Sequence, residues 1–231
     1  MPEYHHSHPH DHQHDHEQML EVSNTLEVTN SERPSYTAHG AAQRQALVEA
    51  AYEIIAQEGF EGLRTREVAR RAGVNIATLH YYFPHKEDLI RGVMDHIREV
   101  FAKRHAPLAA APTNGLEELR HEIVDQEYLL TETPQNYIVL FELALRSLRD
   151  PFIHNIMPRM DANWLQRIRS YLKQGVQQGV FRADLDIETA SAALIAFLKG
   201  CAIQRMVNPG LFPAERVYAE LERWLTGQAP L

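Results

Sequence analysis

The chain has 231 residues, of which 44% are apolar and 23% charged, and its formal net charge is −8. Such a chain can bury a sizeable core as one large or two smaller domains. The single Cys201 excludes an internal disulfide and fits a reducing cytosol. No apolar run approaches the roughly 18 to 20 residues that cross a bilayer, and no signal peptide opens the chain, so we expect a soluble cytoplasmic protein.

Residues 1–39 form a segment of their own, rich in histidine and in acids. Seven of the fourteen histidines lie in the first 18 residues, and the segment carries a net charge of −6. This composition buries too little apolar surface to offset its ordering entropy, so it predicts disorder. Imidazole and carboxylate groups suit Zn²⁺, Ni²⁺ or Cu²⁺. A metal-binding tail and an incidental tail both fit the pattern.

From about Ala41 onward helical periodicity dominates, and the sequence predicts an all-α protein. The first part contains four predicted helices, at residues 41–57, 65–72, 76–82 and 86–105. Gly59 is placed to stop the first helix, and Thr65 can cap the second. Gly73 suits a left-handed turn, and Asn75 caps the third helix.

The two short helices and the turn between them are typical of a helix-turn-helix, which sets its second helix into a DNA major groove. Only Leu79 and Phe83 anchor the third helix inward, so its opposite face is free to approach base edges and phosphates. The alternative is that His80, Tyr81 and Tyr82 merely cap a small three-helix core. The residues expected at DNA are Thr65, Arg66, Asn75, Ile76, Ala77, Thr78, His80, Tyr81 and Lys86.

The negative net charge of the chain does not exclude DNA binding, because the charge is unevenly distributed. Residues 40–105 have a net charge of +1, the least acidic part of the sequence. Five cationic side chains lie in one stretch of 23 residues inside this segment. They are enough for the phosphate contacts of a small DNA-binding module. These cations are Arg64, Arg66, Arg70, Arg71 and Lys86.

The run GFEGLRTREVARRAGVNIATLHYYFPHKEDLI closely resembles the DNA-binding region of the TetR family of bacterial transcriptional regulators, and the resemblance covers about residues 42–90. It implies that Thr65 and Lys86 contact phosphates and that residues 75–81 face the DNA. Ile76 stands where many members carry Lys, so that phosphate contact is absent or comes from Arg64 or Arg66. His80 stands where Tyr is common.

Beyond a linker at residues 105–115 the pattern is again helical. Helices are predicted at residues 116–131, 135–149, 153–178, 187–206 and 213–226. Residues 137–148 are apolar nearly all round, which predicts a central buried helix. We therefore divide the chain into three parts: the tail at 1–39, a DNA-binding domain with its connecting helix at 40–105, and an effector-binding and dimerisation domain at 106–231.

The last two predicted helices carry small and bulky apolar residues at helical spacing, which permits close helix contact. The resemblance implies that they pair with their symmetry mates as a four-helix bundle, and such a homodimer predicts a roughly palindromic operator. Completion of the monomer's own core is the alternative. The residues expected at the dimer interface are Ala193, Ala196, Phe197, Gly200, Leu221 and Trp224.

Aromatic and sulfur-containing residues of the C-terminal part could line a cavity for a small-molecule effector, although ordinary core packing explains each of them singly. The candidates are Tyr128, Tyr137, Phe141, Glu142, Met160, Trp164 and Phe197, with Arg146 and His154 as further polar anchors.

The pattern favours a DNA-binding regulator, a repressor released from its operator by a small molecule. The alternative is a metal-responsive regulator that uses the His-rich tail, or His105 and His121. The sequence has no Gly-rich phosphate loop, no HExxH and no Ser-His-Asp context, so we expect no enzyme activity, no cofactor and no fixed metal site.

Overall fold

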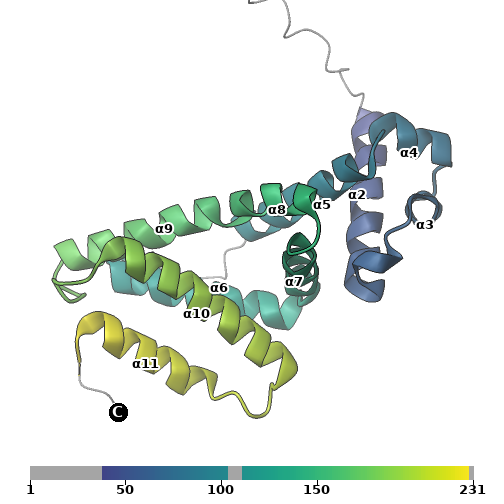
Figure 1. Ribbon diagram of the computed structural model, residues 1–231. Helices are drawn as coiled ribbons and strands as arrows, with labels where there is room; N and C mark the ends of the chain where they lie inside the picture. The colour runs from purple at the N-terminus through teal and green to yellow at the C-terminus, as the bar shows by residue number, and fades with distance from the viewer. Residues whose placement is uncertain (1–37, 104–110, 229–231) are drawn as a thin grey trace, which may run out of the picture. The chain divides into compact units, whose positions relative to one another are not determined.

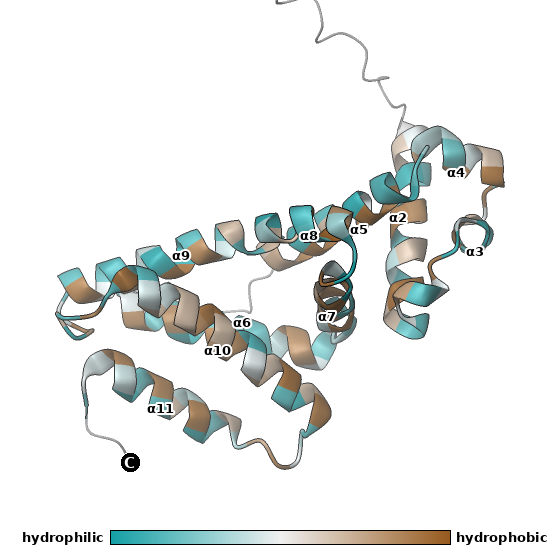
Figure 2. Ribbon diagram, viewed as in Figure 1, coloured by the Kyte–Doolittle hydropathy of each residue, from teal (hydrophilic) through white to brown (hydrophobic). Residues whose placement is uncertain are grey.

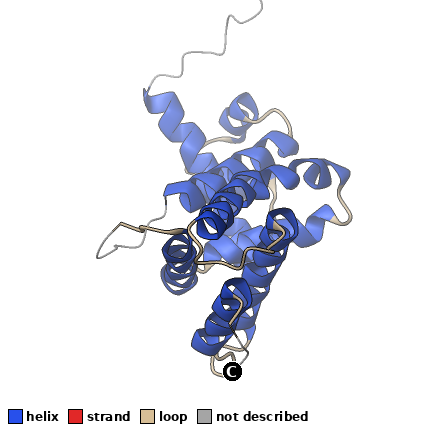
Figure 3. Cartoon of the chain, turned by 90° about the vertical axis from the view of Figure 1, so that its left-hand side faces the viewer, coloured by secondary structure: helices blue, strands red, loops and turns tan. Residues whose placement is uncertain are grey.

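The computed structural model describes residues 38–103 and 111–228, and every regular element in these ranges is helical (Figures 1 and 3). The all-α prediction is confirmed. The described residues from Ala42 onward form one compact unit by their contacts. The His-rich tail and His105 lie outside the described residues, so the predictions of disorder and of metal binding made for them remain predictions.

The first part of this unit, residues 42–103, is called the head below. Its elements are α2 (Ala38–Glu58, which begins just before the head), the 3-10 turn η1 (Phe60–Gly62), α3 (Thr65–Arg71), α4 (Ile76–Tyr82) and α5 (Lys86–Lys103). Gly59 ends α2 with a φ of 73°, and Gly73 forms the turn before α4 with a φ of 67°, as their positions in the sequence predict.

One apolar core holds the head together and extends beyond it. Within the head, Leu47 and Ile54 of α2 are fully buried against Val93 and Ile97 of α5. Spacings of seven residues between Leu47 and Ile54 and of four between Val93 and Ile97 put each pair on one helix face. The same cluster contains Val139 and Leu143 of α7 and Ile153 and Ile156 of α8. The head therefore shares its core with the C-terminal helices.

The C-terminal part contains six helices within the described range 111–228. They are α6 (Gly115–Glu132), α7 (Gln135–Ser147), α8 (Pro151–Ile156), α9 (Pro158–Gln177), α10 (Ile187–Val207) and α11 (Ala214–Thr226). The single helix predicted at 153–178 is wrong, because the chain breaks at Met157 between α8 and α9. Pro158 lacks the N–H that a continuous helix needs there, and it starts α9 instead.

Helices α6, α9 and α10 pack along one another, and α11 covers them (Figure 1). Asn114 caps α6 by accepting from the backbone N–H groups of Leu116 and Glu117, both at 3.0 Å. Gly115 then lies directly against the backbone of α9 at Gly175, where a Cβ would stand only 2.6 Å from the Gly175 nitrogen. The crossing of α6 and α9 therefore requires glycine at position 115.

Two expectations about apolar segments need correction. Helix α7 is largely hydrophobic (Figure 2), but it is not buried all round, because Leu148 at its end is 77% exposed. Helix α10 is long and apolar enough to cross a membrane by length and composition alone, contrary to the prediction that the chain holds no such run. Core helices of soluble proteins pass the same test, so this property decides nothing about location.

Replacement of Gly115 tests the close crossing of α6 and α9. Gly115→Ala adds a methyl group that overlaps backbone atoms, which cannot move as a flexible side chain can. We expect a loss of about 1–3 kcal/mol in the free energy of unfolding, measured by urea denaturation. Gly210→Ala is the matched control, since a Cβ there meets no atom within 4 Å. Equal stability of the two variants would contradict this packing.

Candidate DNA interface and effector pocket

Helix α4 is capped and anchored so that one face remains exposed. The Asn75 side-chain oxygen accepts from the Thr78 backbone N–H at 2.8 Å and from the Thr78 hydroxyl at 3.1 Å. Leu79 is buried within the helix, and Phe83 is buried directly after it. The predicted cap and anchors are confirmed, and they fix the orientation of a helix of only seven residues.

The exposed face of α4 consists of Ile76, Ala77, His80 and Tyr81. Tyr81 is the most open of the large side chains here, at 66% exposed. Tyr82 differs from its neighbours, since it is half-buried and its hydroxyl donates to Gln43 at 3.2 Å. The alternative in which all three aromatic residues cap the head core thus fits Tyr82 alone.

The cations of the head fall into two groups. Glu67 accepts from Arg70 at 2.8 and 2.6 Å and from Arg71 at 3.0 Å. These hydrogen bonds, with that of Arg70 first, lower the pKa of Glu67 to about 2. Arg71 also pairs with Glu58, so both arginines are already neutralised. Two of the five cations that the sequence offers for phosphate contacts are therefore already paired with acids.

Arg64, Arg66 and Lys86 make up the second group, and all three are exposed. Within residues 38–103 and 111–228, Arg64 and Arg66 form no ion pair or hydrogen bond, and Lys86 lies over the Phe60 ring at 4.9 Å. Thr65 is the first residue of α3 rather than its cap, because Arg64 occupies the cap position and makes no side-chain bond there. That prediction was wrong, and the Thr65 hydroxyl is not used for capping.

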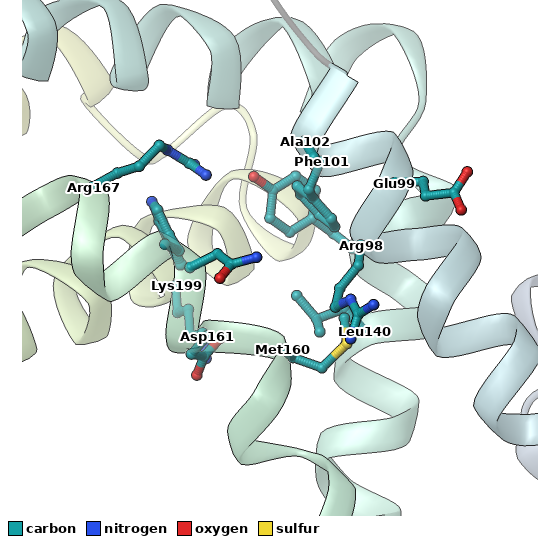
Figure 4. Close-up of a pocket in the computed structure, with 12 residues that line it drawn as sticks. Arg98, Glu99, Phe101, Ala102, Leu140, Met160, Asp161, Arg167 and Lys199 are labelled. Carbon is teal, nitrogen blue, oxygen red and sulfur yellow. The ribbon is translucent and has the colours of Figure 1, made fainter. Parts of the chain in front are cut away.

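A pocket of about 250 Å³ opens between α5, α7, α9 and α10 (Figure 4). Three of the seven sequence candidates line it: Tyr137, Met160 and Trp164. The other lining residues are Arg98, Glu99, Phe101, Ala102, Leu140, Asp161, Asn163, Arg167 and Lys199. Phe101 continues the buried stripe of Val93 and Ile97 by one more turn, which is the sequence signal that could have found it.

The remaining four candidates lie elsewhere. Tyr128 points outward from α6 and is 49% exposed, and Phe197 packs in the core of α6, α9 and α10. Phe141 lies behind Tyr137, with 6.1 Å between the ring centroids. The Glu142 carboxylate accepts from the backbone N–H of Phe60 at 3.3 Å, so it joins α7 to the head. Helical periodicity cannot distinguish these outward, core and inter-helix positions.

The dimer candidates also divide between surface and interior. Ala193, Ala196 and Gly200 are exposed on α10, and Trp224 is exposed on α11. Leu221 is only 5% exposed and packs inside the chain's own core, as does the half-buried Phe197. These last two side chains therefore pack within the chain's own core, and the assignment of the six residues to a dimer interface stays a prediction.

In the described ranges 38–103 and 111–228, no three His, Cys, Asp or Glu side chains are grouped so as to hold a metal ion. His121 lies 3.5 Å from Asp125 on the same helix, and His154 is exposed on α8. Arg146 pairs with Glu61 of the head at 2.8 Å.

Comparison with known proteins identifies both halves of the chain. Residues 47–93 match the model of the bacterial regulatory proteins of the tetR family, and residues 112–230 match the C-terminal region of BetI-type transcriptional repressors. The chain belongs to the TetR family. It is therefore a DNA-binding transcriptional regulator, and this family is regulatory rather than enzymatic.

Its relatives are regulators of the same kind. The transcriptional regulator SrpR of Pseudomonas putida is 25% identical over 166 residues, which cover 71% of this chain and 75% of that protein. The nicotine-responsive repressor HdnoR of Paenarthrobacter nicotinovorans is 20% identical over 168 residues, covering 72% and 85%. A regulator from Saccharomonospora viridis, solved with choline, shares the fold with a TM-score of 0.67 and 24% identity, covering 80% and 95% of the two chains.

Removal of the Asn75 cap should weaken α4. Asn75→Ala leaves the Thr78 N–H without its acceptor, and we expect a loss of about 1 kcal/mol in the free energy of unfolding, measured by urea denaturation. Asn75→Ser keeps an oxygen acceptor and is the matched control, with little loss. If the alanine and serine variants prove equally stable, the side-chain cap does not stabilise the helix.

Proposed function

We propose that this TetR-family regulator is a homodimeric repressor that binds a roughly palindromic operator and leaves it when a small molecule occupies the pocket. The exposed side of α4 reads the major groove, with Thr78 at a base edge and Ile76 or Ala77 at thymine methyl groups. The remaining expected contacts go to phosphates or to nearby bases, from Thr65, Arg66, Asn75, His80, Tyr81 and Lys86.

The Asn75 and Thr78 side chains can serve both the helix and the DNA. Their mutual hydrogen bond uses the Asn75 oxygen and the Thr78 hydroxyl proton. The Asn75 amide nitrogen still has its N–H donors for a phosphate, and the Thr78 oxygen can still accept. The cap therefore holds these two groups in place without exhausting their hydrogen-bonding capacity.

The observation that carries ligand control is the position of α7 between the pocket and the head. Tyr137 and Leu140 line the pocket. On the same helix, Asn136 accepts from the Tyr52 hydroxyl of α2 at 2.9 Å. Glu142 and Arg146 bind η1, through the Phe60 N–H and the Glu61 carboxylate. A ligand that shifts α7 therefore acts directly on the element that carries the DNA-reading helix.

Helix α5 provides a second connection, because Phe101 at its end lines the pocket and Leu89 near its start packs in the head core. A ligand that prefers one position of α5 and α7 changes the spacing of the two α4 helices in a dimer. Operator affinity then falls by the difference in ligand affinity between the two arrangements, typically about 1–3 kcal/mol.

An exposed apolar stripe on α10 supports the homodimer. Ala193, Ala196, Gly200, Ile203 and Val207 recur every three or four residues, and all five are exposed in the single chain. Val207 is 69% exposed, and the space beside Gly200 is open to a Cβ. Small residues permit close approach of a second helix, and burial of this stripe removes apolar surface from water.

A charge in this stripe should separate the protomers. Ala196→Glu would bury an unpaired carboxylate at the centre of the proposed interface, so we expect a shift from dimer to monomer in sedimentation velocity. Ala183→Glu, an exposed position in the turn before α10, is the control and should remain dimeric. A dimeric Ala196→Glu variant would place the interface elsewhere.

The proposed function is tested by titrating the protein against the intergenic DNA next to its own gene, with binding followed by fluorescence anisotropy. Wild type should bind, and Arg66→Gln should bind more weakly, with the slope of log K against log salt reduced by about one per protomer. The reason is that Arg66 is exposed and has no partner in the described chain, so it is available to a phosphate.

Arg70→Gln is the matched control. Arg70 is already paired with Glu67, so its loss should change the salt slope less than the loss of Arg66. If the folded wild-type dimer binds no intergenic DNA near its gene, the repressor proposal fails. Equal slopes for both variants would show instead that the phosphate contacts are made by other residues.

A further inference from the structure

The pocket combines apolar walls with a surplus of hydrogen-bond donors. Phe101 and Tyr137 meet edge to face at 5.3 Å, and Leu140 and Met160 complete this side. The volume of about 250 Å³ corresponds to roughly eight molecules of liquid water. This space suits a small aromatic or short-chain molecule.

The two acids that line the pocket are each paired with a lysine. Asp161 binds the Lys199 ammonium group at 2.5 Å. Glu99 pairs with Lys103 at 3.1 Å on the outer side of α5, and its carboxylate points away from the other labelled side chains (Figure 4). Each of the two carboxylates therefore already has a cationic partner.

The donors are less fully used. Arg167 extends from α9 into the pocket (Figure 4), where it meets the buried Glu122 carboxylate at 3.4 Å and also interacts with the Tyr171 hydroxyl. A guanidinium group has five N–H donors, so Arg167 retains capacity for a bidentate acceptor. The indole Nε1 of Trp164 is buried and has no hydrogen-bond partner within the described residues. A buried donor of this kind is costly unless something accepts from it.

From this arrangement we propose that the effector is a small amphipathic carboxylic acid. In this proposal the carboxylate accepts from Arg167 and from the Trp164 indole N–H, both of which belong to residues that line the pocket, and the apolar body lies against Phe101, Tyr137 and Leu140. The inference rests on the proposed function, because it names the ligand class of the same pocket. It goes beyond that function by fixing the sign of the ligand's charge.

The aromatic walls alone would also suit a cation, since Trp, Tyr and Phe faces attract cationic groups. The charges decide against that class. Three cationic side chains line the pocket. Arg98 pairs with Asp95 at 3.1 Å and Lys199 with Asp161, so Arg167 is the one whose ion pair is longest, at 3.4 Å. A cationic ligand would be repelled by Arg167, and both lining carboxylates already have a lysine partner.

Three probes with one phenylpropyl body test the charge preference: hydrocinnamate, its neutral alcohol and its amine. Binding to the full-length dimer is measured by titration calorimetry without DNA. We expect hydrocinnamate to bind about tenfold or more tightly than the other two, since a charge-assisted hydrogen bond contributes more than a neutral one. Tightest binding of the amine, equal binding of all three, or no binding of hydrocinnamate at millimolar concentration would each overturn the proposal.

Two conservative variants locate the carboxylate. Trp164→Phe keeps an aromatic ring and removes the N–H, and Arg167→Lys keeps the charge beside Glu122 and removes the planar fork. Each should weaken hydrocinnamate binding by about tenfold and leave the weak binding of the alcohol unchanged. The matched control is Arg159→Lys, an exposed position on the same helix, α9.

The outcome is independent of the DNA-binding test. Operator binding by the unliganded wild-type dimer decides the proposed function, whatever the probes do. If the operator is bound and the amine is the preferred probe, the regulator stands and the acid class is wrong. If hydrocinnamate affinity is the same in wild type and in both pocket variants, the acid binds at another site and the assignment of this pocket fails.

Discussion

The backbone N–H of Phe60 donates to the carboxylate of Glu142. This contact joins the head to α7, and the proposed control of DNA binding by a ligand depends on that connection. Gly59 turns the chain at a positive φ immediately before Phe60, so the amide faces outward from the head toward α7. Lys86 and Arg146 both lie over the Phe60 ring, at 4.9 and 4.8 Å. One short corner of the head thus receives hydrogen-bond, ion-pair and cation–π contacts from neighbouring elements. A shared apolar core supports it, so a shift of α7 is transmitted to the head instead of being absorbed by a loop.

The position of α10 in the molecule explains why this helix is so apolar. One side of this helix packs in the core through Leu194, Leu198 and Ala202, while the opposite side carries the exposed stripe of Ala196, Gly200 and Ile203. A helix that is covered on both sides carries apolar residues nearly all round. The same composition makes α10 long and apolar enough to cross a membrane by length and composition alone. In the homodimer proposed above, a second copy of the chain covers the exposed stripe.

The sequence predicted the head far better than the pocket, and the reason is the range of the interactions. The cap from Asn75 to Thr78, the turn at Gly73 and the stripe ending at Ile97 are set by neighbours within four residues, so a local pattern reveals them. The pocket depends on which face of α7 meets α5 and α9. Tyr137 and Glu142 lie little more than one turn apart on α7, yet one lines the pocket and the other binds the head. No periodicity distinguishes such positions, and only the tertiary arrangement does.

The distribution of charge in the head indicates how little energy a ligand would need to release the regulator from DNA. Arg70 and Arg71 are neutralised by Glu67 and Glu58, and Ile76 at the start of α4 offers no charge. Few cations per head remain for phosphates, so we expect a single head to bind weakly at ordinary salt, and in the proposed dimer the affinity comes from two heads held at the correct spacing. Under that proposal a ligand has no need to break any DNA contact directly. A small change in spacing, transmitted from Tyr137 to the Glu142 contact, would remove the advantage of the second head, and a coupling energy of about 1–3 kcal/mol would then be sufficient for release.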